Sequence, residues 1–335
     1  MPAHRTVNLV VRDNGLGLSR DARLLASALT SHGCLVEYTR LGEADERERW
    51  RYGRGWHARY ARWNHAWSRL GGRARYDINI MFEHLWPRHL PLARCNIALP
   101  NPEWFDAKDR LHLDRIDHVW VKTRHAEHLF RELDRNVRWI GFASEDAAIP
   151  GQPRQRAFFH LAGGSRTKGS EELVALWLRH PEWPTLTLVC HRGLDPMPRA
   201  PNLQVITEYL DQDRLRALQN AHAFHLCPSK TEGYGHYLCE AMSLGAIVVT
   251  TDAAPMNELI DPQRGLLVAA TAEGRQGLAT LYRFDPAAME RAVESCLRMD
   301  EAQIAAMGQR AQAWFAANQK DFSARIGAAL DTLNA

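Results

Sequence analysis

Short apolar runs alternate with amphipathic helical patterns along most of the chain, and this alternation limits the possible folds more than any other feature. The run Val7–Val11 is followed by a glycine-containing turn and then by a helix pattern that Ser19 can cap at its amino end. Strands that alternate with helices favour parallel sheets with right-handed crossovers. The expected strands are Val7–Val11, Leu35–Tyr38, Ile78–Phe82, Asn96–Leu99, Val119–Val121, Val137–Ile140, Phe158–Ala162, Thr185–Cys190, Leu203–Ile206, Ala223–Cys227 and Ile247–Thr250.

One segment interrupts the alternation. Ala147–Arg156 holds two prolines, one glycine and few apolar side chains, which is typical of an interdomain linker. A length of 335 residues suits two domains at roughly 150 residues each. We therefore expect two Rossmann-like, doubly wound α/β domains at residues 1–147 and 157–310, with a cleft that faces the carboxyl ends of both sets of strands. In the second half, helices are expected at Ser170–Leu178, Asp211–Asn220, His236–Ser243, Pro255–Ile260 and from Pro286 onward.

The composition excludes several classes of protein. Hydrophobic residues make up 45% of the chain and charged residues 24%, and no run of ~18 apolar residues could span a bilayer. This excludes transmembrane, collagen-like and wholly disordered chains. The six cysteines include no pair at C-x-x-C spacing, which favours reduced thiols over disulfides or a zinc cluster. Because the first residues show no signal-peptide pattern, we expect a cytoplasmic location.

The charge is mildly uneven between the two halves. Residues 1–150 carry 24 Lys and Arg against 19 Asp and Glu, a net charge of +5, and the remainder carries 18 against 20, a net charge of −2. This balance permits an anionic partner for the first half but does not require a nucleic acid. We expect no nucleic-acid partner, since the second half is slightly acidic.

Residues 227–258 form the most informative stretch, which runs from an expected strand through a loop into an expected helix. Gly233 and Gly235 allow unusual backbone dihedral angles and a close approach to a ligand. The amides of this turn lie at a helix amino terminus, where an anion is stabilised. Glu232 and Glu240 can accept hydrogen bonds from sugar and ribose hydroxyls. The alternative for this stretch is an ordinary helix cap followed by a surface glutamate.

The pattern E-G-Y-G-x-x-x-x-E-A-M-x-x-G-x-x-V resembles the donor-site signature of family 4 glycosyltransferases, of the group 1 type. It includes the E-x7-E spacing from Glu232 to Glu240, with Pro228-Ser229 before it and Glu258 after it. The resemblance implies a GT-B fold and a retaining, metal-independent transfer of a hexosyl-type sugar from a nucleotide diphosphate sugar to a hydroxyl acceptor. It also implies that the last helix, residues 311–335, packs back towards the first domain.

The resemblance assigns roles to the residues of the signature. Glu232 matches a catalytic residue near the donor sugar, and Glu240 matches the residue that holds the ribose. The amides of the turn contact the sugar and the phosphates in the family, and the matching residues are Gly233, Tyr234, Gly235 and His236.

A second stretch, His160–Glu171, brings two cations to the start of an expected helix. Arg166 and Lys168 suit a diphosphate leaving group, because both neutralise developing charge. The order Lys168-Gly169 excludes a Walker A loop, and the segment resembles the family's G-R…K-G segment. Arg166 lies closer to Lys168 than in the usual pattern, so either Ser165 or Arg166 takes the family's arginine position. The alternative is a solvated basic loop.

The first half offers less specific candidates. The turn with Gly15 and Gly17 is a poor dinucleotide fingerprint, but in the glycosyltransferase interpretation it lies across the cleft from the donor phosphates. Glu83-His84 and the segment around Glu103 each follow a strand, so they lie where an acceptor would bind. His84 or Glu103 is the candidate for the histidine position that many family members have in this domain, while a buried structural role is the alternative for His84.

Trp50–Tyr76 is rich in arginine, and its aromatic residues fall on one helical face. One interpretation is a helix that packs this stripe on the core of the first domain. The other is a basic amphipathic helix that binds an anionic membrane surface peripherally. The stripe consists of Trp56, Tyr60, Trp63, Trp67 and Leu70.

The sequence predicts neither a metal site nor a cofactor. Histidine pairs at i, i+3 spacing, His125/His128 and His222/His225, lack an H-E-x-x-H motif or a Cys-His cluster. Two other functions remain open for a chain of this pattern: a GT-B nucleotide-sugar epimerase and a non-catalytic protein that binds nucleotide sugars or glycans. The donor base and sugar, the acceptor and the oligomeric state are left open.

Overall fold

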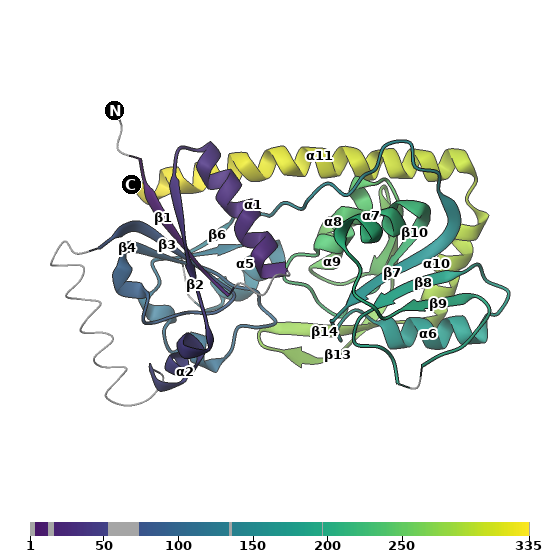
Figure 1. Cartoon of the computed structure of the whole chain (residues 1–335), viewed down its shortest axis with the longest axis horizontal. Coiled ribbons are helices and arrows are strands. Elements are labelled where there is room, and N and C mark those ends of the chain that lie inside the picture. Colours follow the sequence, from purple (N-terminus) through teal and green to yellow (C-terminus); the bar gives the residue numbers. More distant parts are fainter. Residues whose placement is uncertain (1–3, 13–16, 53–73, 134–135, 196, 335) are drawn as a thin grey trace. The chain divides into compact units, whose positions relative to one another are not determined.

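The computed structural model describes residues 4–12, 17–52, 74–133, 136–195 and 197–334, and the chain divides into two compact units (Figure 1). Each unit contains a six-stranded parallel sheet with helices, so the predicted α/β class is confirmed. The first unit consists of Met1–Ala143, Gln276–Leu278 and Lys320–Ala335, and the second of Ser144–Arg275 and Ala279–Gln319.

The sheet of the first unit has the strand order β2-β1-β3-β4-β5-β6. The chain first runs outward from β1 to β2 and then returns to β3 on the other side of β1. The strand order therefore reverses between β1 and β3, which is the kind of position where open α/β sheets bind ligands at their carboxyl edge. The strands are β1 (Thr6–Val11), β2 (Leu35–Arg40), β3 (Tyr76–Phe82), β4 (Ala93–Leu99), β5 (His118–Val121) and β6 (Val137–Trp139).

The inner strands β1 and β3 form where apolar side chains run almost without interruption, as expected for a parallel sheet covered on both faces, whereas the edge strand β2 is largely exposed. Helix α1 (Gly17–Ser31) begins two residues before Ser19, so the prediction that Ser19 caps this helix is wrong. Leu25 and Leu29 of α1 are fully buried. The other helices of this unit are α2 (Glu43–Tyr52), α4 (Ala107–Arg110) and α5 (Arg124–Arg131), with short 3-10 turns at Leu90–Leu92 and Leu113–Arg115.

The sheet of the second unit has the order β12-β11-β10-β7-β8-β9, so its reversal lies between β7 and β10. All expected strands and helices of this unit are present, with ends shifted by a few residues. Helix α8 (His236–Ser243) has the predicted bounds. The remaining elements are β7 (Gln155–Gly163), α6 (Ser170–Arg179), β8 (Leu186–Cys190), β9 (Leu203–Ile206), α7 (Gln212–Ala221), β10 (His222–Cys227), β11 (Ile247–Thr251) and α9 (Met256–Leu259).

Three strands were not predicted from the sequence. β12 (Gly265–Val268) extends the second sheet beside β11, and β13 (Ala270–Gln276) pairs with β14 (Ala279–Phe284) as a separate two-stranded ribbon. The turn of this ribbon, Gln276–Leu278, belongs to the first unit. There the amide of Leu278 donates a hydrogen bond to the carbonyl oxygen of Pro102 at 2.8 Å, and the leucine side chain is buried in the core of that unit.

The chain ends in helices α10 (Pro286–Arg298) and α11 (Glu301–Asp331), followed by a 3-10 turn at Thr332–Asn334. Residues 301–319 of α11 belong to the second unit and residues 320–331 to the first. Phe315 is buried in the second unit, and in the first unit the rings of Phe322 and Phe142 lie 5.0 Å apart. Among the described residues, no helix has the length and apolarity that a membrane crossing requires.

Two buried histidines lie on the adjacent central strands of the second unit. His160 of β7 is bonded through Nδ1 to the carbonyl oxygen of Leu226 (2.7 Å) and through Nε2 to the hydroxyl of Ser170 (2.9 Å). His225 of β10 donates from Nε2 to the carbonyl oxygen of Gln219 at 2.9 Å. Burial disfavours the imidazolium form, which lowers the pKa of His160 to about 4 and that of His225 to about 3.

We expect the second unit to lose stability between pH 7 and pH 5. In the unfolded chain a histidine takes up a proton near pH 6.5, whereas the folded His160 and His225 stay neutral until well below pH 5, so the unfolded state binds more protons in this range. The loss is on the order of 2 kcal/mol for each histidine. Urea unfolding followed at several pH values measures it, and a free energy of unfolding that is equal at pH 7 and pH 5 would contradict the assignment.

Candidate active site

Two loops leave the second sheet at the point where its strand order reverses. The first loop, residues 164–169, connects β7 to α6, and the second, residues 228–235, connects β10 to α8. The main chains meet directly, because the amide of Lys230 donates to the carbonyl oxygen of Thr167 at 2.8 Å. The two stretches that the sequence singled out therefore lie side by side at the ligand-binding edge of a doubly wound sheet.

An ion pair between Lys168 and Glu232 joins the two loops. Only 17% of the lysine side chain and 12% of the glutamate side chain are exposed, so the pair is sheltered but still accessible. The ammonium nitrogen of Lys168 also lies 3.7 Å from the ring centroid of Tyr237, a cation–π contact. These contacts hold the lysine in one position.

Two hydroxyl groups extend the contacts of the ion pair. Ser229 donates from its hydroxyl to the carboxylate of Glu232, and the same hydroxyl lies 2.5 Å from the phenol oxygen of Tyr237. Burial raises the pKa of Tyr237 well above its ordinary value, so the phenol keeps its proton and serves as a donor. Ser229 and Lys168 both contact Oε1 of Glu232 and so orient its carboxylate.

Glycine is required where each helix of the site begins. Gly169 precedes α6 with φ 71°, and a Cβ there would lie 2.5 Å from the carbonyl oxygen of Pro228. Gly235 precedes α8 with φ 109°, and a Cβ there would lie 2.9 Å from side-chain atoms of Leu238 and Leu259. These positive φ angles and close contacts favour glycine, which lacks the Cβ.

The residues that the sequence predicts to bind an anion, Gly233–His236, form the turn into the amino end of α8. The amides of Leu238 and Cys239 both donate hydrogen bonds to the carbonyl oxygen of Gly235, where the first turn of the helix closes. The Tyr234 side chain is buried and accepts a hydrogen bond from Asn318 at 3.0 Å. His236 contacts the hydroxyl of Ser144 through Nδ1 at 2.7 Å. These side-chain contacts anchor the turn, in which Gly233, Tyr234 and Gly235 are buried and His236 is partly exposed.

Glu240 lies on the buried face of α8, with 6% of its surface exposed. The side-chain amide of Gln219, near the end of α7, donates to its Oε2 at 3.1 Å. A carboxylate in this position can accept further hydrogen bonds from hydroxyl groups of a ligand.

Three more residues lie in the first loop or contact it. Arg166 is exposed and has no ion-pair partner among the described residues, and the hydroxyl of Ser165 lies 3.0 Å from that of Thr167. Arg192 was missed from the sequence: its Nε donates to the carbonyl oxygen of Ser165 at 3.3 Å, and its Nη2 lies 3.0 Å from Glu171. The sequence offered one indication of this contact: Arg192 comes two residues after β8, the strand that pairs with β7.

The candidates from the amino-terminal half belong to the first unit. Gly15 lies outside the described residues, and Gly17 is the exposed first residue of α1. Most of Trp50–Tyr76 also lies outside them, so neither the helical stripe nor the membrane contact can be placed. Glu103 follows β4, and its carbonyl oxygen would lie 2.8 Å from a Cβ at Gly277.

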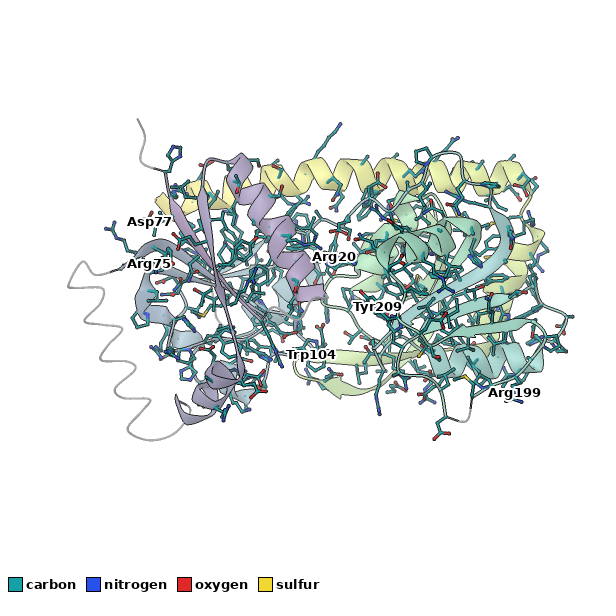
Figure 2. All side chains as sticks on the ribbon, in the orientation of Figure 1. Arg20, Arg75, Asp77, Trp104, Arg199 and Tyr209 are labelled. Carbon is teal, nitrogen blue, oxygen red and sulfur yellow. The ribbon has the colours of Figure 1, made fainter. Side chains whose placement is uncertain are left out.

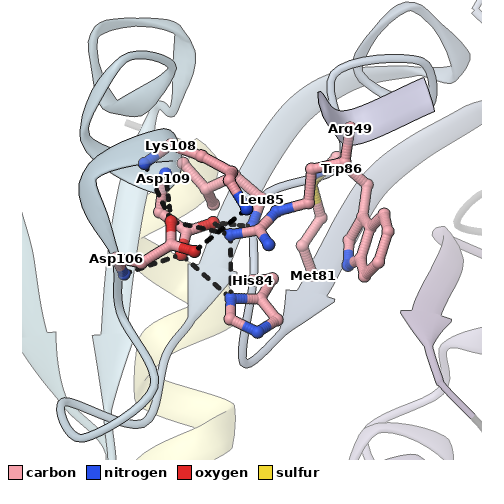
Figure 3. A network of polar contacts seen from close by, with 8 residues as sticks. All are labelled: Arg49, Met81, His84, Leu85, Trp86, Asp106, Lys108 and Asp109. Atoms are coloured by element: carbon pink, nitrogen blue, oxygen red, sulfur yellow. Dashed lines mark hydrogen bonds and ion pairs between the residues drawn. The ribbon is translucent and has the colours of Figure 1, made fainter. Parts of the chain in front are cut away.

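His84 belongs to a polar network of the first unit (Figure 3). Its Nδ1 lies 2.9 Å from Oδ2 of the buried Asp109 and 3.0 Å from Nη2 of Arg49, which also lies 2.6 Å from Oδ1 of Asp109. Burial raises the pKa of Asp109, but the hydrogen bond with His84 and the charge of Arg49 outweigh it and lower this pKa below its ordinary value. The network fixes the His84 ring through its Nδ1 atom.

Among the described residues, His84, Asp106 and Asp109 have the donor atoms and spacing that could hold a metal ion. The guanidinium of Arg49 already lies between them, 3.0 Å from an oxygen of Asp106 and 2.6 Å from one of Asp109. An arginine cation therefore supplies the positive charge that these carboxylates require.

Comparisons with known proteins agree with the predicted resemblance. Residues 182–298 match the family model described as "Glycosyl transferases group 1". A search of curated proteins by sequence finds no match. The matched range contains the whole stretch from Glu232 to Glu240 and does not include Lys168.

Solved structures of the same fold cover nearly the whole chain. Sucrose-phosphate synthase from Thermosynechococcus elongatus has a TM-score of 0.71 at 17% identity, over 98% of this chain and 99% of that chain. Anabaena HepE in complex with UDP and glucose has a TM-score of 0.68 at 14% identity, over 98% of this chain and 100% of that chain. A UDP-forming α,α-trehalose-phosphate synthase from Burkholderia xenovorans has a TM-score of 0.68 at 14% identity, over 99% of this chain and 100% of that chain. The GT-B fold is thereby confirmed.

We expect Gly169→Ala to destabilise the second unit by about 2 kcal/mol or more, since the new Cβ adds left-handed strain and contacts the Pro228 backbone. Gly164→Ala in the same loop is the matched control, because nothing lies within 4 Å of a Cβ there and only a change within about 0.5 kcal/mol is expected. Thermal unfolding compares the two variants. Equal melting temperatures would show that the loops do not pack as described.

Proposed function

We propose that the protein is a retaining, metal-independent glycosyltransferase that moves a sugar from a nucleotide diphosphate sugar to a hydroxyl acceptor. The observation that carries this proposal is the Lys168–Glu232 pair, which stands at the reversal of the second sheet beside the amino end of α8. A cation next to the amino end of a helix suits a diphosphate, and a carboxylate next to it suits a sugar. The match of residues 182–298 to group 1 glycosyltransferases supports the same conclusion.

Sugar transfer requires that the negative charge that develops on the leaving diphosphate be stabilised. The bond between the anomeric carbon and the phosphate oxygen breaks, and its electron pair leaves with the diphosphate. Lys168 and the amides of Gly233–His236 stabilise that charge, with Arg166 or Arg192 as a second cation. The acceptor hydroxyl oxygen forms the new bond from the same face, and its proton passes to the departing phosphate oxygen.

Glu232 acts on the sugar rather than on the phosphates. Its carboxylate accepts hydrogen bonds from sugar hydroxyls and favours the positive charge that develops on the ring. The bond from Ser229 and the ion pair with Lys168 fix its orientation before the donor binds, which reduces the cost of organising the transition state.

The nucleoside end of the donor has its own candidates. Glu240 accepts hydrogen bonds from the ribose hydroxyls, as in the family. Tyr209 follows β9, is 78% exposed and lies 5.7 Å from the ring of His191, so these two rings are candidates to stack on the base. One of the similar structures is described as a complex with UDP and glucose, and another as a UDP-forming enzyme, so uracil is the first base to test.

We expect Lys168→Ala and Glu232→Gln each to lower the rate of sugar transfer by about 10² or more, the scale of losing one electrostatic stabiliser. The assay follows UDP release from UDP-glucose with a panel of methyl glycosides and sugar phosphates as acceptors. Arg199→Ala is the control, because Arg199 precedes β9 whereas Tyr209 follows it, and Figure 2 shows them at opposite ends of the second sheet. Rates near the wild-type value in both site variants would contradict the assignment. UDP release that never depends on an acceptor would favour an epimerase, and donor binding without any UDP release would favour a binding protein.

We expect Glu240→Gln to weaken UDP binding about 10-fold, because a ribose hydroxyl loses its charged acceptor. The wild-type protein should prefer UDP to 2′,3′-dideoxy-UDP, and the variant should lose most of this preference. Calorimetric titration with both nucleotides measures the difference. An unchanged preference in the variant would exclude Glu240 as the ribose partner.

A further inference from the structure

Glu83 occupies the position in the first unit that corresponds to the donor loops of the second. It directly follows β3, and the strand order of the first sheet reverses between β1 and β3. Ligands of doubly wound sheets bind outside the carboxyl ends of the strands at such a reversal. The amide of Glu83 donates to the carbonyl oxygen of Leu99 at 3.0 Å, which ties it to the end of the neighbouring strand β4.

The backbone of Glu83 is strained. Its φ is 63°, and it is the one residue other than glycine with a positive φ in the part of the chain that the structure describes. The amide of His84 bonds back to the carbonyl oxygen of Phe82 at 2.7 Å, which makes a tight three-residue turn centred on Glu83. Glycine would adopt this conformation without penalty, so a glutamate here has a cost that a purely structural turn does not explain.

The carboxylate of Glu83 is half-buried and has no hydrogen-bond or ion-pair partner among the described residues. Its charged neighbours are occupied elsewhere. Lys122 is buried in an ion pair with Asp21, and Arg12 lies 2.5 Å from Glu46. Burial, the largest effect, raises the pKa of Glu83.

The surroundings favour an uncharged ligand that carries hydroxyl groups. An anionic group would be repelled by Glu83 and would find the nearest cations already paired, whereas a hydroxyl can donate a hydrogen bond to the carboxylate. Trp104 lies on the loop that follows the adjacent strand β4, and its side chain is 51% exposed (Figure 2). An exposed aromatic face packs well against the apolar face of a sugar ring.

We propose that Glu83 is an acceptor-binding residue, which accepts a hydrogen bond from a hydroxyl of an uncharged sugar or glycoside at the carboxyl edge of the first sheet. This inference rests on the proposed function, because it assigns the acceptor class of the same reaction. The strained turn projects the carboxylate, and the exposed tryptophan of the next loop provides a surface for the ring.

Two variants separate the carboxylate from the turn that presents it. Glu83→Gly removes the carboxylate and relieves the left-handed strain, so it should raise the melting temperature by about 2 °C or more. Glu83→Gln keeps the strain and the size of the side chain but removes the charge. Binding is measured by saturation-transfer NMR with methyl α-glucoside, methyl β-galactoside and methyl α-mannoside, and with glucose 6-phosphate for comparison, all in the presence of UDP.

The wild-type protein should give saturation transfer to at least one neutral glycoside and less to glucose 6-phosphate. Both variants should reduce the glycoside signal about fivefold or more, while the shift in melting temperature that UDP causes stays unchanged. A Glu83→Gly protein that is more stable and binds glycoside as well as the wild type would overturn the proposal. So would stronger transfer to glucose 6-phosphate, or no transfer to any glycoside in the wild type. A wild type that UDP does not stabilise would count against the proposed function, and the glycoside signals would still decide the role of Glu83.

Discussion

The ion pair between Lys168 and Glu232 is the contact on which the candidate donor site depends. It joins two loops that are far apart in sequence and that leave adjacent strands at the reversal of one sheet. An ion pair as buried as this one contributes little to stability by itself, since desolvation offsets much of the attraction. Its importance for the proposed function lies in the positions that it fixes: the lysine is the proposed cation for the diphosphate, and the carboxylate is the proposed hydrogen-bond acceptor for the sugar.

The pair can form because the backbones of both loops approach closely. Gly169 lies against the carbonyl group of Pro228, and Gly235 turns the chain into α8 at a φ that other residues adopt at a cost. At the strand reversal of the first unit, the residue with the left-handed conformation is not a glycine but Glu83. Strain of this kind persists where the side chain has a role, and this connects Glu83 with the proposed acceptor site.

Most of the fold could be predicted because buried parallel strands read as continuous apolar runs. The ribbon β13–β14 could not be predicted in this way, since most of β13 is exposed and polar. The donor loop around Glu232 was recognisable because its residues are close in sequence. Arg192 and the Arg49–Asp109 contact were not, because each depends on segments that only the folded chain brings together. The start of α1 was predicted at Ser19 because serine is a favoured capping residue. The helix begins at Gly17 instead, since residue type alone does not determine which residue caps a helix.

A crystal structure of the protein with UDP bound tests the central claim most directly. The account predicts phosphate oxygens within about 3 Å of the Lys168 ammonium and of the amides in the turn Gly233–His236, with the ribose beside Glu240. A diphosphate bound at any other place, with the Lys168–Glu232 pair unchanged and out of reach, would contradict it.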